Sequence, residues 1–227
     1  LILYGNGANG KSIVLLVLQL LLGDKSCSSA GLEDFDSRRQ FGLVQTLGKL
    51  ANICSELNSV TRAAESTLKK YVSGEKMGFE EKGCPIFYSR PTARLIFSGN
   101  ALPKFKDSTD ALWRRMVLIP FEKQLLNDQD QNKALKTEEY WHDELPGIVN
   151  WAMEGLRELM TDKGFARSEK MDACINEYYH FSNAEADFLQ QTIVRGRSTD
   201  SIFSSQIYSK YREWMLLEGG EPVKKGD

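Results

Sequence analysis

The sequence is short of the residues that build metal sites, disulfide frameworks and membrane spans. Its 227 residues include two histidines and four cysteines, and no two cysteines form a CxxC pair. A structural zinc site is therefore not expected, and scattered single cysteines fit a reducing compartment better than a secreted disulfide scaffold. The chain also lacks a run of about 20 apolar residues and a signal peptide, so we expect no membrane association.

The sequence also lacks a large excess of positive or negative charge. The formal net charge is −2, whereas a protein that coats nucleic acid non-specifically is usually far more basic. Nucleic-acid binding would therefore depend on a local basic loop, which a symmetric assembly encircling DNA would repeat in each subunit. The composition is otherwise that of an ordinary globular protein, with 41% hydrophobic and 26% charged residues. The length suits one large domain, or one domain with a small second one.

The most specific motif is GNGANGKS, which occupies residues 5–12 and matches GxxxxGK[ST]. It follows an apolar strand predicted at 1–4 and leads into a helix predicted at 11–22, which is the setting that a phosphate loop needs. A glycine-rich turn with a chance lysine would not require that setting. Inward-turned backbone N–H groups and the helix amino terminus favour phosphate. The predicted nucleotide-binding residues are Gly5, Asn6, Gly7, Ala8, Asn9, Gly10, Lys11 and Ser12.

Within this motif two side chains have predicted chemical roles. Lys11 is expected to reach the β- and γ-phosphates, and the Ser12 hydroxyl to bind Mg²⁺, which makes ATP and Mg²⁺ the expected cofactors. Glu56 follows a predicted strand at 49–55 and is the candidate for holding Mg²⁺ and positioning water. The plainer interpretation of Glu56 is an exposed glutamate at a helix start.

Two further polar positions follow later in the chain. Asn100 ends the predicted strand at 93–98, where a polar group can sense the γ-phosphate; it could equally be a turn asparagine beside a glycine. Arg114 and Arg115 precede a strand predicted at 116–121. A guanidinium there could stabilise transition-state charge at a neighbouring subunit's nucleotide, and the alternative is a surface arginine pair.

Taken together, these motifs resemble the superfamily 3 helicases, in particular the helicase part of phage, plasmid and poxvirus primase-helicases. The resemblance covers roughly residues 1–125. It rests on GNGANGKS at 5–12, NICSELN at 52–58, LKKYVSGEKMGFEEKG at 68–83, PTARLIFSGNALP at 91–103 and DALWRRMVLIPF at 110–121. It implies an α/β fold: a P-loop NTPase (AAA+-like) with a parallel-sheet core, a helical C-terminal region and a partial winged helix.

The resemblance also assigns residues. Glu56 resembles the acidic Walker B residue, Asn100 resembles sensor 1, and Arg115 resembles the arginine finger, with Arg114 as the second choice. The stretch at 74–82 is similar to the family's pore hairpin, in which Lys76 and Lys82 would contact DNA phosphates and Phe79 would stack on a base. The alternative for that stretch is a solvated charged loop, because three glutamates dilute its positive charge.

Three segments are expected: an ATPase domain at 1–125, a helical extension at 126–195, and a partial winged-helix-like module at 196–227. Because the chain opens inside a predicted strand, we also expect it to be a piece of a longer protein. The aromatic residues Tyr208, Tyr211 and Trp214 of the module lie at helical spacing, which makes them core residues first.

The leading hypothesis is thus an ATP-dependent DNA helicase that acts as a ring, usually a hexamer, on single-stranded DNA. A primase domain or primase partner and the cytoplasm of a bacterial host are expected with it, while phage, plasmid and integrated element stay open. Two alternatives remain: another P-loop enzyme, such as a small-molecule kinase or an initiator ATPase, or a nucleotide- or DNA-binding module without unwinding activity of its own.

Overall fold

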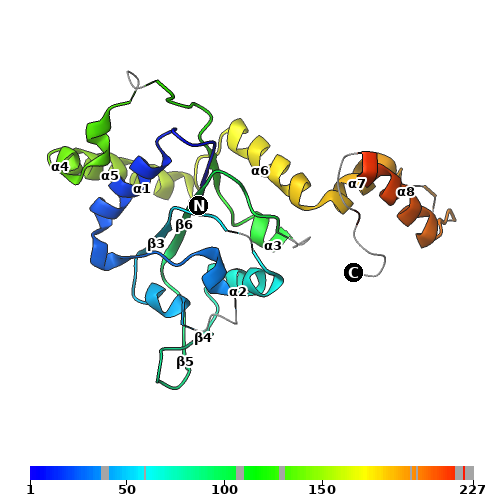
Figure 1. Ribbon diagram of the computed structural model, residues 1–227, viewed down its shortest axis with the longest axis horizontal. Helices are drawn as coiled ribbons and strands as arrows, with labels where there is room; N and C mark the ends of the chain where they lie inside the picture. Colours follow the sequence, from blue (N-terminus) through cyan, green and yellow to red (C-terminus); the bar gives the residue numbers. More distant parts are fainter. Residues whose placement is uncertain are drawn as a thin grey trace. The chain divides into compact units, whose positions relative to one another are not determined.

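The computed structural model describes residues 1–36, 41–58, 60–105, 110–127, 131–194, 196–197, 199–217 and 222. Five parallel strands form a sheet with the order β2-β3-β6-β1-β7. These strands are β1 Ile2–Tyr4, β2 Cys27–Ser28, β3 Ala51–Cys54, β6 Arg94–Gly99 and β7 Leu118–Pro120. Figure 1 labels the neighbouring strands β3 and β6 of this sheet. The sheet places β1, which leads into the phosphate motif, between β6 and β7.

Helices connect these strands and follow them along the chain. The α-helices are α1 Lys11–Leu22, α2 Arg62–Val72, α3 Asp110–Trp113, α4 Glu138–Trp141, α5 Leu145–Asp162, α6 Glu169–Ser182, α7 Ala184–Thr192 and α8 Ser204–Leu217. Short 3-10 helices are η1 Asp24–Ser26, η2 Leu32–Phe35, η3 Leu43–Thr46 and η5 Lys133–Lys136. Strands thus alternate with helices in the first half and the second half is helical, which confirms the predicted α/β layer.

Each face of the sheet carries its own apolar core, because successive strand residues point to opposite faces. Ile2 packs in the larger cluster, together with Phe97, Leu118 and residues of α2 and α3. Leu3 packs in a second cluster with Leu15 of α1. Ile2 and Leu3 therefore point to opposite faces of the sheet, one covered by α2 and α3 and the other by α1.

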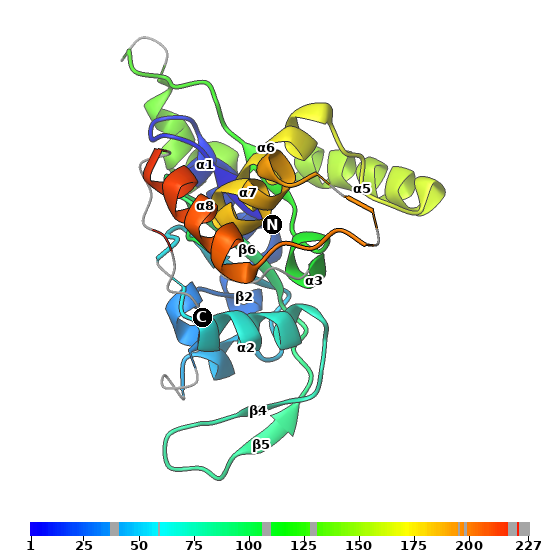
Figure 2. The same cartoon turned by 90° about the vertical axis from the view of Figure 1, so that its right-hand side faces the viewer.

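The strands β4 Met77–Phe79 and β5 Phe87–Ser89 form a separate antiparallel hairpin. Figures 1 and 2 show that this hairpin extends beyond α2, away from the parallel sheet. Its register pairs Gly78 with Tyr88 and Phe79 with Phe87. The stretch at 74–82 does contain a hairpin strand, β4, but the second strand, β5, lies beyond that stretch.

Local signals explain where prediction and structure agree or differ. The sequence at 62–72 fits a helix, and α2 has these bounds, because the Thr61 hydroxyl accepts a hydrogen bond from the Ala64 N–H and caps the first turn. Residues 168–194 also have helical spacing, but the helix is interrupted at the buried Asn183, whose backbone (φ −125°, ψ 61°) is not helical. Strand β2 was not predicted, since two residues carry no periodic signal.

The chain divides into two compact units, Leu1–Tyr179 and His180–Asp227. In the second unit, α7 and α8 pack through Phe188, Tyr211 and Met215, so the predicted core role of Tyr211 is confirmed. The predicted winged-helix-like end lies partly outside the described residues, at 198, 218–221 and 223–227. The predicted three-part division stays a prediction. No helix within the described ranges is long and apolar enough to span a bilayer.

Candidate functional site

The phosphate motif surrounds one buried lysine. Lys11, the first residue of α1, is only 6% exposed, and its ammonium donates three hydrogen bonds. The acceptors are the Gly5 carbonyl at 2.6 Å, the Asn9 Oδ1 at 2.9 Å and the Asn100 Oδ1 at 3.1 Å. Burial lowers the pKa of Lys11 below its ordinary value, because a desolvated ammonium favours the neutral form. The three oxygens counter that penalty by satisfying its donors.

The backbone of the motif approaches β7 closely. A Cβ atom on Gly5 would lie 2.2 Å from the Phe121 carbonyl oxygen, so only glycine fits there. Two residues farther into the loop, Gly7 has open space, while Ala8 has a positive φ of 57°. A left-handed alanine is uncommon and must be held by its surroundings. The loop is therefore a constrained structure rather than a free turn.

The sheet order brings three predicted site residues to one edge. In a parallel sheet all strands end at the same edge, and the neighbours β3, β6 and β1 lead into Glu56, Asn100 and the phosphate loop respectively. The register confirms this alignment, since Tyr4 at the end of β1 pairs with Gly99 at the end of β6. Asn100 and Lys11 are in direct contact, and Glu56 is exposed on the adjacent loop.

Three contacts hold the loop that carries Glu56. The Cys54 thiol donates to the Glu56 carbonyl at 3.3 Å, and the Asn58 amide donates to the Glu33 Oε1 at 3.0 Å. Leu57 packs so tightly over Gly99 that an added Cβ there would lie 2.8 Å from its Cδ1. The Glu56 loop is thereby fixed against the residue that precedes Asn100. The contacts of Asn58 with Glu33 and of Leu57 with Gly99 join distant segments, so no local sequence signal indicates them.

A cavity of about 220 Å³ opens between α1 and the end of β3. It is lined by Ser12, Leu15, Leu16, Gln19, Ile53 and Ser55. The hydroxyls of Ser12 and Ser55 and the nearby carboxylate of Glu56 are hard oxygen donors, which is the chemistry that Mg²⁺ prefers. Within the described part of the chain, no three His, Cys, Asp or Glu side chains group as metal ligands. A magnesium ion here would accordingly need water and phosphate oxygens as well.

The two candidate arginines lie elsewhere. Arg114 and Arg115 are exposed and precede β7, whereas the phosphate loop follows β1. Because β7 runs parallel to β1, the arginines stand near the opposite edge of the sheet from Lys11. The Arg115 guanidinium donates to the Ala111 carbonyl of its own turn. The structure does not bring the arginines together with the other site residues of the same chain.

The hairpin residues divide between two faces. Lys76 and Lys82 are exposed, as a contact with DNA phosphates requires. Phe79, in contrast, is 2% exposed, and its ring stacks on Phe87 at a centroid distance of 6.2 Å. This corrects the expectation for Phe79, because a buried ring offers no face to a base. Phe87 is 40% exposed, and the more exposed ring is Tyr88, at 67%, on the opposite face above Gly78.

Comparisons with known proteins agree with this architecture. The model of a family described as of unknown function, DUF5906, matches residues 3–115. A helicase-named protein of Acanthamoeba polyphaga mimivirus is 25% identical over 246 residues, which covers 94% of this chain and 24% of the viral protein. A helicase-named protein of Invertebrate iridescent virus 3 is 27% identical over 127 residues, covering 52% of this chain and 14% of that protein. The chain thus spans a quarter or less of these relatives.

A solved structure supports the fold. The apo C-terminal region of NrS-1 superposes with a TM-score of 0.53 at 16% identity, covering 86% of this chain and 50% of that structure. At this identity the likeness concerns the fold alone. Together with the parallel five-stranded sheet, it gives the chain an α/β, P-loop NTPase-like fold, as predicted. The viral relatives support a helicase-like domain.

Proposed function

We propose that this chain is the ATP-hydrolysing core of a DNA helicase of the superfamily 3 type, which moves single-stranded DNA through a ring. The observation that supports this proposal most directly is the 3.1 Å hydrogen bond from the Lys11 ammonium to the Asn100 Oδ1. It joins the phosphate motif to a polar side chain that ends the neighbouring strand. A homo-hexamer, a primase domain or partner, and a bacterial host cytoplasm are part of the same proposal.

The proposed roles follow from the edge of the sheet. Lys11 would exchange at least one of its oxygen acceptors for a phosphate oxygen when a nucleotide binds. Ser12 would bind Mg²⁺, and the exposed Glu56 carboxylate would hold the attacking water. The γ-phosphate would either bind the Asn100 side chain or displace it from Lys11. In both cases the Asn100 side chain would lie differently in the nucleotide-bound and nucleotide-free forms.

An interface between subunits would complete the site. Arg115 precedes β7, and β7 runs toward the edge of the sheet where the phosphate loop lies, which we call the phosphate edge. The length of β7 therefore separates Arg115 from Lys11 of the same chain. A neighbouring subunit in a ring would bring its Arg115 to this nucleotide, with Arg114 as the second choice. The proposed DNA contact is the exposed face of the hairpin, through Lys76 and Lys82, one copy from each subunit.

The first experiment measures ATP hydrolysis by the full-length protein with and without single-stranded DNA. Lys11→Ala should lower the rate roughly 100-fold or more, because the transition state loses the ammonium proposed to contact the β- and γ-phosphates. Lys210→Ala is the matched control, since this lysine is exposed and forms an ion pair with Glu213 on the surface. DNA-stimulated turnover that survives Lys11→Ala would exclude the proposed site. Hydrolysis by the wild type that ignores DNA would favour an initiator or metabolic ATPase.

Mixing two inactive variants tests the proposed interface. Lys11→Ala and Arg115→Ala should each be inactive alone, yet a mixed ring contains interfaces with an intact Lys11 on one side and an intact Arg115 on the other. We therefore expect partial recovery of hydrolysis on mixing. If the mixture stays inactive while both variants still assemble with each other, Arg115 does not act across the interface.

A further inference from the structure

The segment that follows β7, residues 121–125, is hydrogen-bonded to three consecutive residues of the phosphate loop, and we call it the strap. The Asn9 amide donates to the Phe121 carbonyl at 2.9 Å. The Gln124 amide donates to the Gly7 carbonyl at 3.1 Å, and the Leu125 N–H donates to the Ala8 carbonyl at 2.7 Å. The strap therefore contacts each residue at the turn of the loop.

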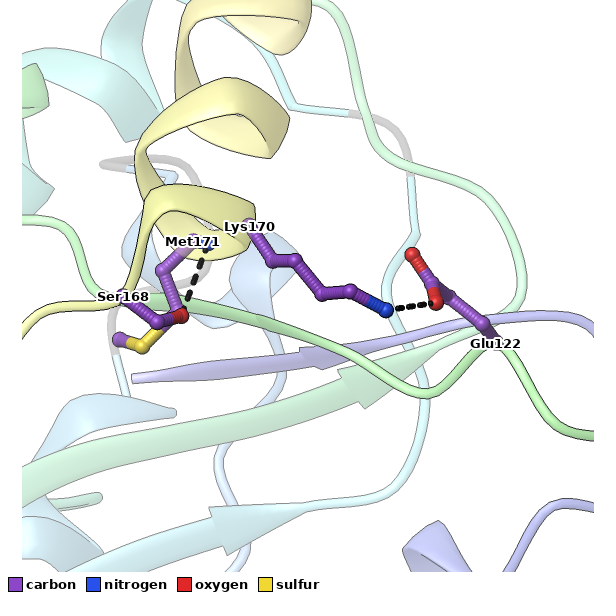
Figure 3. A network of polar contacts seen from close by, with 4 residues as sticks. All are labelled: Glu122, Ser168, Lys170 and Met171. Carbon is purple, nitrogen blue, oxygen red and sulfur yellow. Dashed lines mark hydrogen bonds and ion pairs between the residues drawn. The ribbon is translucent and has the colours of Figure 1, made fainter.

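The strap is itself anchored on the sheet. The Phe121 N–H donates to the Tyr4 carbonyl at 2.6 Å, which continues the pairing between β7 and β1. Its outer side carries Glu122, which forms an ion pair with Lys170 of α6 at 2.8 Å (Figure 3). Both side chains of that pair are more than 60% exposed, so solvent screens it strongly. The anchoring contact is accordingly the one on β1.

The geometry of these bonds leaves the loop free to bind an anion. The strap forms hydrogen bonds with the carbonyl oxygens of Gly7 and Ala8 and with the side chain of Asn9. These bonds do not involve the backbone N–H groups that would face phosphate. It also accounts for the left-handed alanine. A positive φ at Ala8 costs roughly 1 kcal/mol, and the bond from Leu125 to the Ala8 carbonyl holds that conformation.

Asn9 joins the strap to the reactive cation. Its Oδ1 accepts from the Lys11 ammonium at 2.9 Å, while its Nδ2 donates to Phe121. A single amide thus fixes where the Lys11 charge lies relative to β7. An alanine or serine at position 9 would keep the glycine-rich pattern of the loop but would lose this link.

We propose that Asn9 and Gln124 are positioning residues for nucleotide binding. Through them the strap holds the phosphate loop in its binding shape before the nucleotide arrives, and Asn9 orients the Lys11 ammonium toward the phosphates. This inference rests on the proposed function, because it takes the phosphate loop to be a nucleotide site. It adds a residue from outside the motif, Gln124, that no phosphate-loop pattern contains.

The test compares three variants of the full-length protein by titration with a fluorescent ATP analogue and by steady-state hydrolysis. Gln124→Ala removes one hydrogen bond and should weaken nucleotide binding roughly three- to ten-fold, raising KM with kcat within about two-fold. Asn9→Ala removes two and should weaken binding more, roughly ten- to fifty-fold. Lys170→Ala removes only the exposed ion pair on the same strap and is the matched control, with unchanged binding.

Thermal unfolding separates positioning from simple destabilisation. Gln124 is exposed, so Gln124→Ala should unfold at the wild-type temperature while its nucleotide affinity falls. The inference is overturned if the wild type binds nucleotide and Gln124→Ala binds it equally well. It is also overturned if affinity falls only in proportion to lost stability. A wild type that binds no nucleotide would instead remove the proposed function, so the two failures are distinguishable.

Discussion

The phosphate edge of the sheet and the β4–β5 hairpin organise their polar groups in opposite ways. At the edge, polar side chains are partners of one another: Lys11 bonds to Asn9 and Asn100, and Asn58 bonds to Glu33. On the hairpin, lysines and glutamates face solvent, and attachment to the body depends on apolar side chains, Met77 and Phe79.

This difference shows where substitutions act. At the edge, changing one polar group leaves a partner unsatisfied, so effects should appear in nucleotide chemistry. On the hairpin, side chains alternate between an attached and a free face, so neighbouring positions should differ sharply in what they do. A structural role and a binding role can therefore lie one residue apart on the hairpin.

The largest expected effect separates the two hairpin faces. Phe79→Ala should reduce the free energy of unfolding by about 3–5 kcal/mol, because it removes a buried ring from the core. Tyr88→Ala, on the free face, should change it by no more than about 0.5 kcal/mol. Denaturant unfolding measures both. Equal costs for the two substitutions would mean that the hairpin is not attached through the Phe79 face.

A smaller effect is expected where the Glu56 loop meets β6. Gly99→Ala places a Cβ within 2.9 Å of Leu57, so the loop must shift, at a cost of roughly 1–3 kcal/mol. Because Glu56 and Asn100 flank this contact, ATP hydrolysis should slow more than stability alone explains. Leu57→Gly removes both the Cδ1 and the Cβ atoms that the new methyl group would meet, so adding it to Gly99→Ala should restore part of the rate, with Leu57→Gly alone as control. A double variant as slow as the single one would refute the steric explanation.

The smallest effect compares one cysteine from each region. Burial and the neighbouring Glu33 carboxylate raise the pKa of Cys54 at the phosphate edge, whereas Cys84 on the hairpin is exposed. The thiolate is the reactive form, so a raised pKa leaves Cys54 less reactive at a given pH, and its rate should climb as pH rises. At pH 8 iodoacetamide should label Cys84 about ten-fold faster or more, as followed by mass spectrometry. Similar rates would indicate an open Glu56 loop.

Much of the edge could be predicted from the sequence, because its signals are local. A strand, a glycine-rich loop and a helix follow one another at 1–22, and the contact between Lys11 and Asn100 follows from two strands ending at the same edge. The helix bounds of α1 and α2 follow from a glycine and a threonine cap. The placement of Glu56 on the loop after β3 was predicted as well.

The rest depends on distant pairings that leave no local signal. Whether Phe79 or Tyr88 faces the body is set by the register of β4 on β5, and a shift of one residue exchanges the faces. The sequence placed Phe121 at the end of a predicted strand and carried no signal for Gln124, since the bond from Gln124 to Gly7 joins residues far apart in the chain. Asn9 was placed in the motif, but its link to Phe121 needs the strand order.

The interior position of β1, between β6 and β7, has a consequence for how the protein folds. Ile2 finds its strand partners at Phe97 and Leu118, roughly one hundred residues later in the chain. Ribosomes add roughly 5–20 residues per second, so the first strand waits on the order of ten seconds for its neighbours. Under the proposed function, a nucleotide could therefore assist only the last stage of folding, when β7 arrives and the strap closes on the loop.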